Sequence, residues 1–519
     1  MATAARSPAR TSATAALRRV EWPVWALVGL TVLAAAIRFG SLNGQSFWLD
    51  ESYALGNIRF HSLAGMFDWM RVHEMTPPLY FLFARAWTHV FGFGEVGFRS
   101  LSALLGTAVV PLVYAAGAAF RSRRLGLIVA AFAALDPVTI WYSQEGRNYA
   151  LVLFLAAVAF LAFAQLVTGA GLGWLAVWWV ASALMLGTHY FAVFYVAGLA
   201  VVLLLRLRRG PVLAALAALG VVELLILPYA LAASSHVGFD PIRAIPVGYR
   251  LAQIPSQFAW GPVEGRFGPW AIAAVTVIGT ALAAAAALRS RDPVARLTAA
   301  TAGLAALVAV GVPAVVTLAG VDYLTPRYLL PAWIPVAFVW AAPFAAGRRR
   351  WIGAVAVCAC MAAASAYLLS SPAVQRPDWS AVARALGPAS RDRAVVAPHE
   401  GLPLRLYLTP RDVDHGIAVS RLTHADVSEI AVIGTRGAHR RGCWWGGACQ
   451  LPAKLLPRIG PPAPGFRLVR SEAVGRFRIA VFRAPSRRSV RIDAPRLYTG
   501  TDAMGLTEFV QRPGPVVTR

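Results

Sequence analysis

Two carboxylates stand side by side near the start of a chain that is poor in acidic residues. The stretch SFWLDESYALG (46–56) places Asp50 next to Glu51, a few residues after an apolar run. The chain has 24 Asp and Glu residues against 49 Lys and Arg. A carboxylate can act as a general base toward a hydroxyl group, and a neighbouring carboxylate raises the pKa of one member of a pair. Asp50 and Glu51 are therefore the candidate catalytic residues.

Four other short segments carry polar residues between apolar runs. They are HEMTPPLY (73–80), QEGRNY (144–149), GTHYF (187–191) and TPRYLLP (325–331). Arginine at a dry interface suits a phosphate, because its donors form a fixed fork. A base beside such arginines suggests group transfer from a lipid phosphate. The candidate substrate-binding residues are His73, Glu74, Arg147, Tyr149, His189 and Arg327.

The elements that must position these residues are membrane helices. The 519 residues are 58% hydrophobic and 14% charged, whereas a soluble domain has about 25% charged residues. The composition predicts a polytopic membrane protein with a soluble part attached. The net charge of +25 is explained by arginines in cytoplasmic loops and at anionic lipids, and not by nucleic-acid binding.

A membrane span needs about 20 apolar residues. No repeat with a period of 20 to 50 residues is visible, which weakens a transporter interpretation because many transporters are built from repeats. The apolar runs predict eleven spans, at residues 23–39, 100–119, 126–143, 148–168, 172–187, 189–206, 211–231, 269–288, 297–318, 328–346 and 351–371.

Arginine distribution predicts the orientation of these spans. With the N-terminus in the cytoplasm, four of the five short cytoplasmic loops are arginine-rich, as the positive-inside rule requires. Residues 1–20 are then a cytoplasmic tail. The long loop 40–99, with its Asp-Glu pair, lies outside, as do the other candidate residues and everything after 372.

The composition changes after residue 372, where long apolar runs stop. A helix over 376–386, strands over 393–398 and 429–434, and two strands about a tight turn within 466–484 predict a small extracytoplasmic α/β domain. We expect this domain to cover 372–485 and a flexible basic tail to cover 486–519.

Several further residues leave alternatives open. Cys443 and Cys449 could form a disulfide outside the membrane, remain free thiols or bind a metal. Glu223 lies within a span and is either functional or a hydrogen-bonded residue of the bundle. The C-terminal part contains five further polar residues that could be metal ligands. The simpler interpretation is that they are ordinary surface residues. They are His399, Glu400, Asp412, Asp414 and His415.

Taken together, the motifs resemble a known family. WLDESYA, PPLYFLF, YSQEGRNYAL, THYFAVF, PRYLLP and RPDWSAVARAL occur in this order over residues 20–390. They resemble the GT-C glycosyltransferases, in the branch with bacterial family-39 protein O-mannosyltransferase-like enzymes and aminoarabinose transferases. The resemblance implies an all-α polytopic bundle, residues 21–371, in the cytoplasmic membrane of a bacterium, with the α/β domain outside.

The resemblance also implies an activity. Such enzymes move a sugar, here mannose or a pentose, from a polyprenyl monophosphate to an extracytoplasmic glycan, lipid or protein. Asp50 is similar to the catalytic base and Glu51 to its partner, while Glu74 resembles a second active-site carboxylate. Arg147 and Arg327 would face the carrier phosphate.

The implied reaction is a single displacement with inversion, and the alternative is a retaining route in which a carboxylate forms a covalent intermediate. It needs no cofactor, because arginine can carry the charge of the leaving phosphate, although a divalent metal stays open. His189 would hold the acceptor, the phosphate or a metal. The alternatives from other classes are a transporter or flippase of lipid-linked sugars and a membrane scaffold without activity.

The chain departs from its relatives at two positions. Thr76 stands where many relatives have a histidine before the double proline, and His73 lies three residues earlier. Gly146 stands where alanine is commoner, and we expect this difference to matter little.

Overall fold

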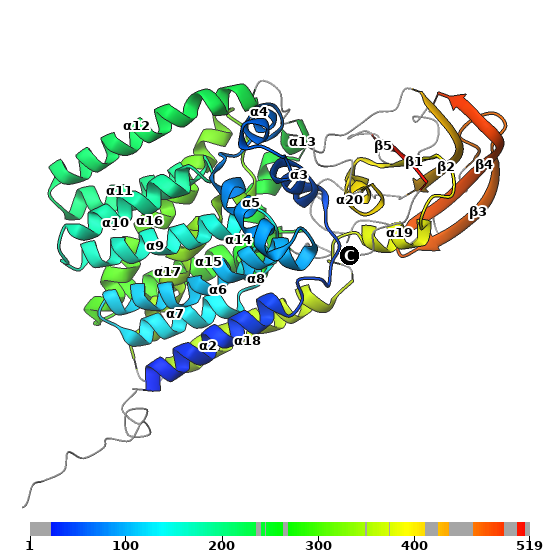
Figure 1. The fold of residues 1–519 in the computed structure, drawn as a ribbon. Coiled ribbons are helices and arrows are strands. Elements are labelled where there is room, and N and C mark those ends of the chain that lie inside the picture. Colours follow the sequence, from blue (N-terminus) through cyan, green and yellow to red (C-terminus); the bar gives the residue numbers. More distant parts are fainter. Residues whose placement is uncertain are drawn as a thin grey trace, which may run out of the picture.

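The structure is a computed structural model in which a helical bundle carries an α/β domain at one end (Figure 1). The predicted tail 1–20, the pair Cys443 and Cys449, and the cluster 412–415 lie outside the residues it describes. Those residues are 22–234, 240–243, 245–262, 268–347, 350–372, 374–409, 424–434, 460–491 and 506–513.

The predicted class of membrane bundle is confirmed. Within the described residues, eight helices are long and apolar enough to cross a membrane. They are α2 (Trp22–Phe39), α6 (Glu95–Ala119), α9 (Tyr149–Val167), α12 (Arg209–Ser234), α15 (Trp270–Leu288), α16 (Pro293–Leu318), η1 (Pro326–Ala332) with α17 (Trp333–Ala345), and α18 (Trp351–Ser370).

The three remaining predicted ranges also form helices. α7 (Arg123–Leu135) and α8 (Pro137–Ser143) together are apolar enough for a ninth span, bent by 58°. α10 (Gly173–Leu186) and α11 (Ala192–Arg206) are apolar but shorter than the others. The apolar pattern therefore located helices in all eleven ranges, although the two short helices fall below the length of a full span.

The outer surface of the bundle carries large apolar side chains, unlike the surface of a soluble protein. α9 runs through the centre, where the rings of Phe120, Phe160 and Phe338 meet at centroid distances of 4.7 to 6.3 Å. At the periphery, α12 leaves Leu224 and Leu225 66% and 77% exposed. Large apolar side chains facing outward are expected of a helix in contact with lipid.

The break between α7 and α8 has a local cause. Pro137 cannot continue the backbone hydrogen bonds of α7, and the Asp136 carboxylate caps α8 by accepting from the N–H of Val138 at 2.9 Å. The carbonyls left open at the break accept from Arg38, which is fully buried and donates to Ala133 O at 2.7 Å. The bend brings the turn after α8 to one end of the bundle.

Most connecting elements gather at the end of the bundle that carries the α/β domain (Figure 1). We call this end the loop face. Ser62 caps the helix Leu63–His73 and accepts from the N–H of Gly65, and Pro78 precedes the helix Leu79–Phe91. The elements of the loop face are α3 (Leu49–Ile58), α4 (Leu63–His73), α5 (Leu79–Phe91), α13 (Asp240–Arg243) and α14 (Val247–Trp260).

The predicted α/β domain is confirmed as a mixed five-stranded sheet with the order β3-β4-β2-β1-β5. β1 and β2 are parallel, and the other neighbouring strands are antiparallel. β1 is buried on both faces, as a central strand between two apolar layers must be. The elements are α19 (Trp379–Leu386), β1 (Arg393–Pro398), η2 (His399–Gly401), α20 (Pro403–Leu408), β2 (Ala425–Gly434), β3 (Arg467–Val474), β4 (Phe477–Val490) and β5 (Leu506–Gln511).

The domain extends further along the chain than the sequence predicted. β4 continues to Val490, and residues 506–511, assigned above to a flexible tail, form β5. β5 pairs with β1 from Arg393 with Gln511 to Pro398 with Leu506. A six-residue strand among basic and proline residues has too weak a local pattern to be recognised, and it is stabilised by pairing with a distant strand.

The domain is docked on the loop face by hydrogen bonds. Tyr407 of α20 donates to Glu95 at 2.6 Å and accepts from the N–H of Phe47 at 2.8 Å. Ser46 donates to Pro377 O at 2.8 Å and accepts from the N–H of Trp379 at 3.0 Å. The segment before α3 is thus held against the start of the domain.

Candidate active site

Among the described residues, four arginine–carboxylate pairs that include Asp50 and Glu51 lie next to one another at the loop face. Their formal charges cancel, four against four, as buried ionised groups require. The pairs are Arg99 with Glu51 (2.6 Å), Arg327 with Asp50 (2.5 Å), Arg147 with Glu74 (3.2 Å) and Arg376 with Glu145 (2.8 Å).

Glu51 is sealed inside the protein. Its side chain has no exposed surface, and Arg99 grips it with two hydrogen bonds of 2.7 and 2.6 Å. The N–H of Gly146 donates to the same carboxylate at 2.8 Å. Burial alone would raise the pKa of Glu51, but Arg99, with Arg376 and the Gly146 N–H, outweighs it and lowers the pKa. Glu51 is therefore not the member of the Asp-Glu pair whose pKa is raised.

Asp50 has a different environment from its neighbour. Its side chain is 18% exposed and accepts from Arg327 at 2.5 Å, the one hydrogen bond to this carboxylate within the described part of the chain. Its backbone carbonyl accepts from Arg147 at 3.4 Å. Successive residues of a helix point about 100° apart, so Glu51 faces the protein interior while Asp50 faces the open side.

Glu74 and Arg147 form a rigid pair. Glu74 accepts five hydrogen bonds, including those from Asn57 at 3.0 Å and from the Thr76 hydroxyl at 2.9 Å. Thr76, which stands in the place of a histidine in relatives, thus supports Glu74. The Nε of Arg147 is buried and has no hydrogen-bond partner among the described residues.

His189 lies beside the two arginines of the site. The N–H of Phe191 donates to its Nδ1 at 3.2 Å, so the proton of the neutral ring is on Nε2. Nε2 is buried and lacks a partner within the described residues. Burial, with the charges of Arg327 and Arg147, lowers the pKa of His189 to about 3. The ring is therefore a neutral donor at physiological pH.

Tyr149 helps to hold Arg327. The Arg327 guanidinium lies 5.6 Å from the ring centres of both Tyr149 and Tyr328. An arginine between two aromatic faces is favoured by cation–π attraction and loses rotational freedom. Tyr149 comes from the first turn of α9 and Arg327 from the start of η1, so two distant segments meet here.

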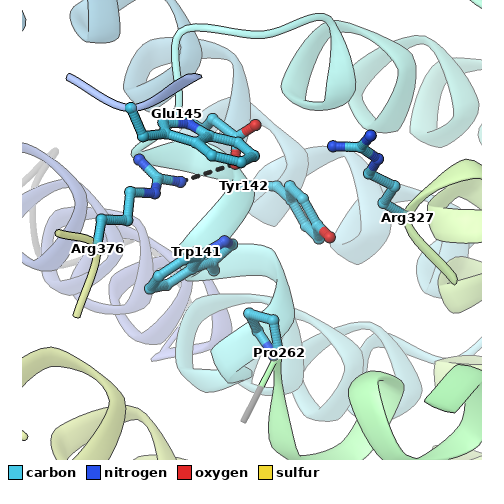
Figure 2. Close-up of a pocket in the computed structure, with 7 residues that line it drawn as sticks. Trp141, Tyr142, Glu145, Pro262, Arg327 and Arg376 are labelled. Atoms are coloured by element: carbon cyan, nitrogen blue, oxygen red, sulfur yellow. Dashed lines mark hydrogen bonds and ion pairs between the residues drawn. The ribbon is translucent and has the colours of Figure 1, made fainter. Parts of the chain in front are cut away.

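Glu145 and Arg376 border a small pocket (Figure 2). Glu145 is 1% exposed, and burial raises its pKa to about 7 against the attraction of Arg376. The Arg376 guanidinium lies 5.0 Å from the ring centre of Trp48 and 4.6 Å from that of Trp141. Arg327 is on the other side of the pocket, so the pocket adjoins the Asp50 pair.

His73 does not join the other predicted residues. It is exposed at the end of α4, and its ring stacks on Trp69 with 3.6 Å between centroids. The i, i+4 spacing on the helix brings these two rings together, and Glu74 takes the inward position one residue later.

Four residues of the site, Arg99, Glu145, Arg376 and His399, were not among the predicted candidates. Arg99 lies near the start of a long apolar helix, where an ionisable side chain is itself a signal of function. Arg376 belongs to a motif quoted above, but its partner Glu145 is 231 residues away. His399, interpreted as a surface residue, instead lies 3.4 Å from the Tyr53 hydroxyl, and burial lowers its pKa while Asp50 opposes that shift.

No three His, Cys, Asp or Glu side chains of the described residues are close enough together to hold a metal ion. Glu223 is half-buried on α12, and burial leaves one of its oxygens without a hydrogen-bond partner in the described part of the chain. Glu223 is not a member of any of the four pairs.

Comparisons with known proteins gave matches only among solved structures. No family model and no curated protein sequence matches the chain. ArnT from Cupriavidus metallidurans bound to undecaprenyl phosphate aligns with 18% identity and a TM-score of 0.46, over 68% of this chain and 66% of that one. The apo ArnT structure aligns with 19% identity and a TM-score of 0.47, also over 66% of its length.

The archaeal oligosaccharyltransferase AglB from Archaeoglobus fulgidus, in complex with an inhibitory peptide and a dolichol-phosphate, aligns with 13% identity and a TM-score of 0.43. The alignment covers 67% of this chain and 55% of AglB. At these identities the likeness concerns the fold.

Gly146 matters more than the sequence comparison suggested. A Cβ at this position would lie 2.1 Å from the ring of Phe98, which is 1% exposed. We predict that Gly146→Ala lowers stability by about 1–3 kcal/mol, through overpacking, and loosens the turn that donates to Glu51. Thermal unfolding of the purified protein measures this, with Gly171→Ala as control because its Cβ meets nothing within 4 Å. Equal melting temperatures for both variants would contradict the prediction.

The Glu51–Arg99 pair predicts a pH-dependent stability. The folded state lowers the pKa of Glu51, so the pair stabilises the protein above the unfolded pKa of about 4.3, and this contribution is lost as the pH falls toward the folded value. Glu51→Gln should cost about 3–5 kcal/mol near pH 7 by leaving Arg99 unpaired. The difference in unfolding free energy between wild type and variant should shrink below about pH 4. A difference that is constant with pH would refute this.

Proposed function

We propose that the protein is a glycosyltransferase that moves a sugar from a polyprenyl-phosphate carrier to an acceptor. The observation that carries the proposal is the Asp50–Arg327 pair: a partly exposed carboxylate in contact with an arginine at 2.5 Å. The pair brings a proton acceptor for the acceptor hydroxyl and a cation for the departing phosphate to one site.

The carrier phosphate would bind between Arg327 and Arg147. Two buried N–H groups without partners among the described residues, Arg147 Nε and His189 Nε2, support an anion site here. Because His189 is neutral, it would donate to the phosphate without adding charge. This favours phosphate binding among the roles expected for His189. The apolar carrier chain would lie along the bundle surface in the bilayer.

The proposed chemical step is a single displacement. The acceptor oxygen attacks the anomeric carbon while Asp50 removes its proton, and the bond from that carbon to the phosphate oxygen breaks with its electron pair on the oxygen. Arg327 and Arg147 stabilise the charge of the released polyprenyl phosphate. One displacement inverts the anomeric centre.

Glu51 and Glu74 fit positioning roles better than direct roles. Glu51 has no exposed surface, so it cannot touch an acceptor, and Glu74 has its lone pairs occupied by five donors. We propose that Glu51 fixes α3 and the turn at Gly146, and that Glu74 orients Arg147. Both would act through the residues that they hold.

We further propose that the loop face points out of the cytoplasmic membrane of a bacterium, with the N-terminus inside. The arginine-rich loops at the other end support this orientation. Mannose or a pentose as the sugar, and a glycan, lipid or protein as the acceptor, remain part of the proposal. The docked domain adjoins Asp50 through His399 and is suited to help bind the acceptor.

Asp50→Asn tests the proposed base. We expect sugar transfer, or donor hydrolysis, to fall by at least about 10²–10⁴-fold, because asparagine cannot accept the proton. Binding of undecaprenyl phosphate should remain, since Arg327 and Arg147 are unchanged. The assay is release of the carrier from radiolabelled polyprenyl-phosphate sugars by the purified protein.

Asp68→Asn is the matched control, because Asp68 has a 74% exposed side chain on α4. Wild-type activity in Asp50→Asn, with a melting temperature equal to that of the control, would refute Asp50 as base.

A further inference from the structure

The short helix α20 of the α/β domain is shared by two hydrophobic cores (Figure 1). Leu404 and Leu408 pack in the core of the domain, together with Trp379. Leu402, which precedes the helix, and Leu406 pack in the core of the helical bundle. Residues four apart on a helix share a face, and residues two apart point about 200° from each other. The alternating leucines therefore give α20 one apolar face for each core.

Tyr407 of α20 lies where these two cores meet. Its ring packs against both, and the ring centroid is 6.1 Å from that of Phe47. Its hydroxyl donates to Glu95 at 2.6 Å and accepts from the backbone N–H of Phe47 at 2.8 Å. Burial and the charge of Glu95 raise the pKa of Tyr407. The hydroxyl therefore keeps its proton and serves both partners at once.

The Tyr407 hydroxyl holds the chain immediately before the proposed base. Phe47 is three residues before Asp50, and Asp50 is the second residue of α3. The Phe47 N–H lies ahead of the helix and donates to a residue 360 positions later in the sequence. Ser46, one residue earlier, is bonded to Pro377 and Trp379 of the same domain. The entry of the chain into α3 is therefore fixed from the domain.

Glu95 connects the same hydroxyl to the bundle. It lies in the first turn of α6, four residues before Arg99, which binds Glu51. Tyr407 thus joins three elements: α20, the segment before α3 and the start of α6. Arg99 holds α3 from inside the bundle, and Tyr407 holds its start from the domain.

The position of Asp50 depends on the backbone that carries it. Within the described residues its carboxylate accepts one hydrogen bond, from Arg327. A general base must lie within about 2.6–3.2 Å of the proton that it removes. A displacement of about 1 Å can cost about 10²-fold in rate. A bond that fixes the start of α3 is therefore able to control the chemical step.

We propose that α20 is a positioning element for the base: its Tyr407 hydroxyl holds the start of α3 where Asp50 can receive the proton of the attacking hydroxyl. This role rests on the proposed function, because the assignment of Asp50 as base is made there. It gives the α/β domain a part in the chemical step that does not depend on the acceptor. A domain that only binds the acceptor would have no effect when water takes the acceptor's place.

Tyr407→Phe removes the hydroxyl and keeps the ring. Hydrogen–deuterium exchange of the full-length protein in detergent measures the amides of residues 46–56. We expect them to exchange at least about ten-fold faster in the variant, because the start of α3 opens more readily when Phe47 loses its acceptor. Tyr195→Phe is the matched control, since Tyr195 is 3% exposed and donates to Ala156 O at 2.9 Å.

Hydrolysis of the donor measures the base without a sugar acceptor. The substrates are radiolabelled mannose and arabinose derivatives of undecaprenyl phosphate, with water as the attacking hydroxyl. We expect kcat to fall at least about ten-fold in Tyr407→Phe. The KM for the donor and the affinity for undecaprenyl phosphate should stay within about three-fold of wild type, because the phosphate ligands Arg327 and Arg147 are unchanged.

Glu95→Ala tests the same hydroxyl from the bundle side. It removes the carboxylate that orients Tyr407, so we expect faster exchange of residues 46–56 and slower hydrolysis. Glu95→Gln is its control, because the amide oxygen can still accept from Tyr407, and its rate should stay within about three-fold of wild type. These two variants decide the proposal if thermal unfolding shows that Tyr407→Phe is not folded.

The outcomes separate this role from the proposed function. If residues 46–56 exchange equally in wild type and Tyr407→Phe, or exchange faster with kcat unchanged, the positioning role is wrong and the proposed function stands. If wild type binds undecaprenyl phosphate but hydrolyses neither donor, the positioning role is also overturned, since it requires turnover with water. If wild type neither binds undecaprenyl phosphate nor hydrolyses a donor, the proposed function fails, and the positioning role fails with it.

Discussion

Ion pairs hold the segments of the loop face together, because a buried charged side chain needs a partner of opposite charge. The pair on which the others depend is Glu51 with Arg99. Arg99 donates five hydrogen bonds, two to Glu51 and three to the carbonyls of Leu42, Gln45 and Ser46, so one side chain shapes the segment before α3. Glu51 in turn accepts from Gly146 and fixes the turn that carries Arg147. Removing either member would leave an uncompensated charge in the centre of the site.

The sequence was sufficient to predict the helices and the order of the polar segments, because an apolar run is a local signal. It was not sufficient to predict which charges pair. The partners are 48 residues apart for Glu51 and Arg99, 231 for Glu145 and Arg376, and 277 for Asp50 and Arg327. Such contacts follow from tertiary packing, and the periodicity of apolar residues in the sequence does not reveal them. His73 and Glu74 show that the sequence is also insufficient at short range. They are adjacent in the chain, yet the His73 ring is exposed and Glu74 is buried.

The α/β domain is part of the site and not an appendage. The chain leaves α18 and returns across the loop face, where Arg376 pairs with Glu145 before α19 begins. Tyr407 and His399 then contact Glu95 and Tyr53, residues of the first loop and the helix that follows it. The composition changes at residue 372, before the sheet begins, but composition cannot show that the sheet-bearing part contacts the loops between the preceding helices.

The four paired carboxylates differ in exposure and in the number of hydrogen bonds that they accept. A general base must reach its substrate, and it must have a lone pair that the protein has not already used. Glu51 has no exposed surface, Glu74 accepts five hydrogen bonds, and Glu145 is 1% exposed at the far side of the pocket from Arg327. Asp50 differs in both respects, since its side chain is 18% exposed and, within the described residues, accepts one hydrogen bond. Burial and pairing of the other three acids therefore support Asp50 as the one of the four that we propose as the base.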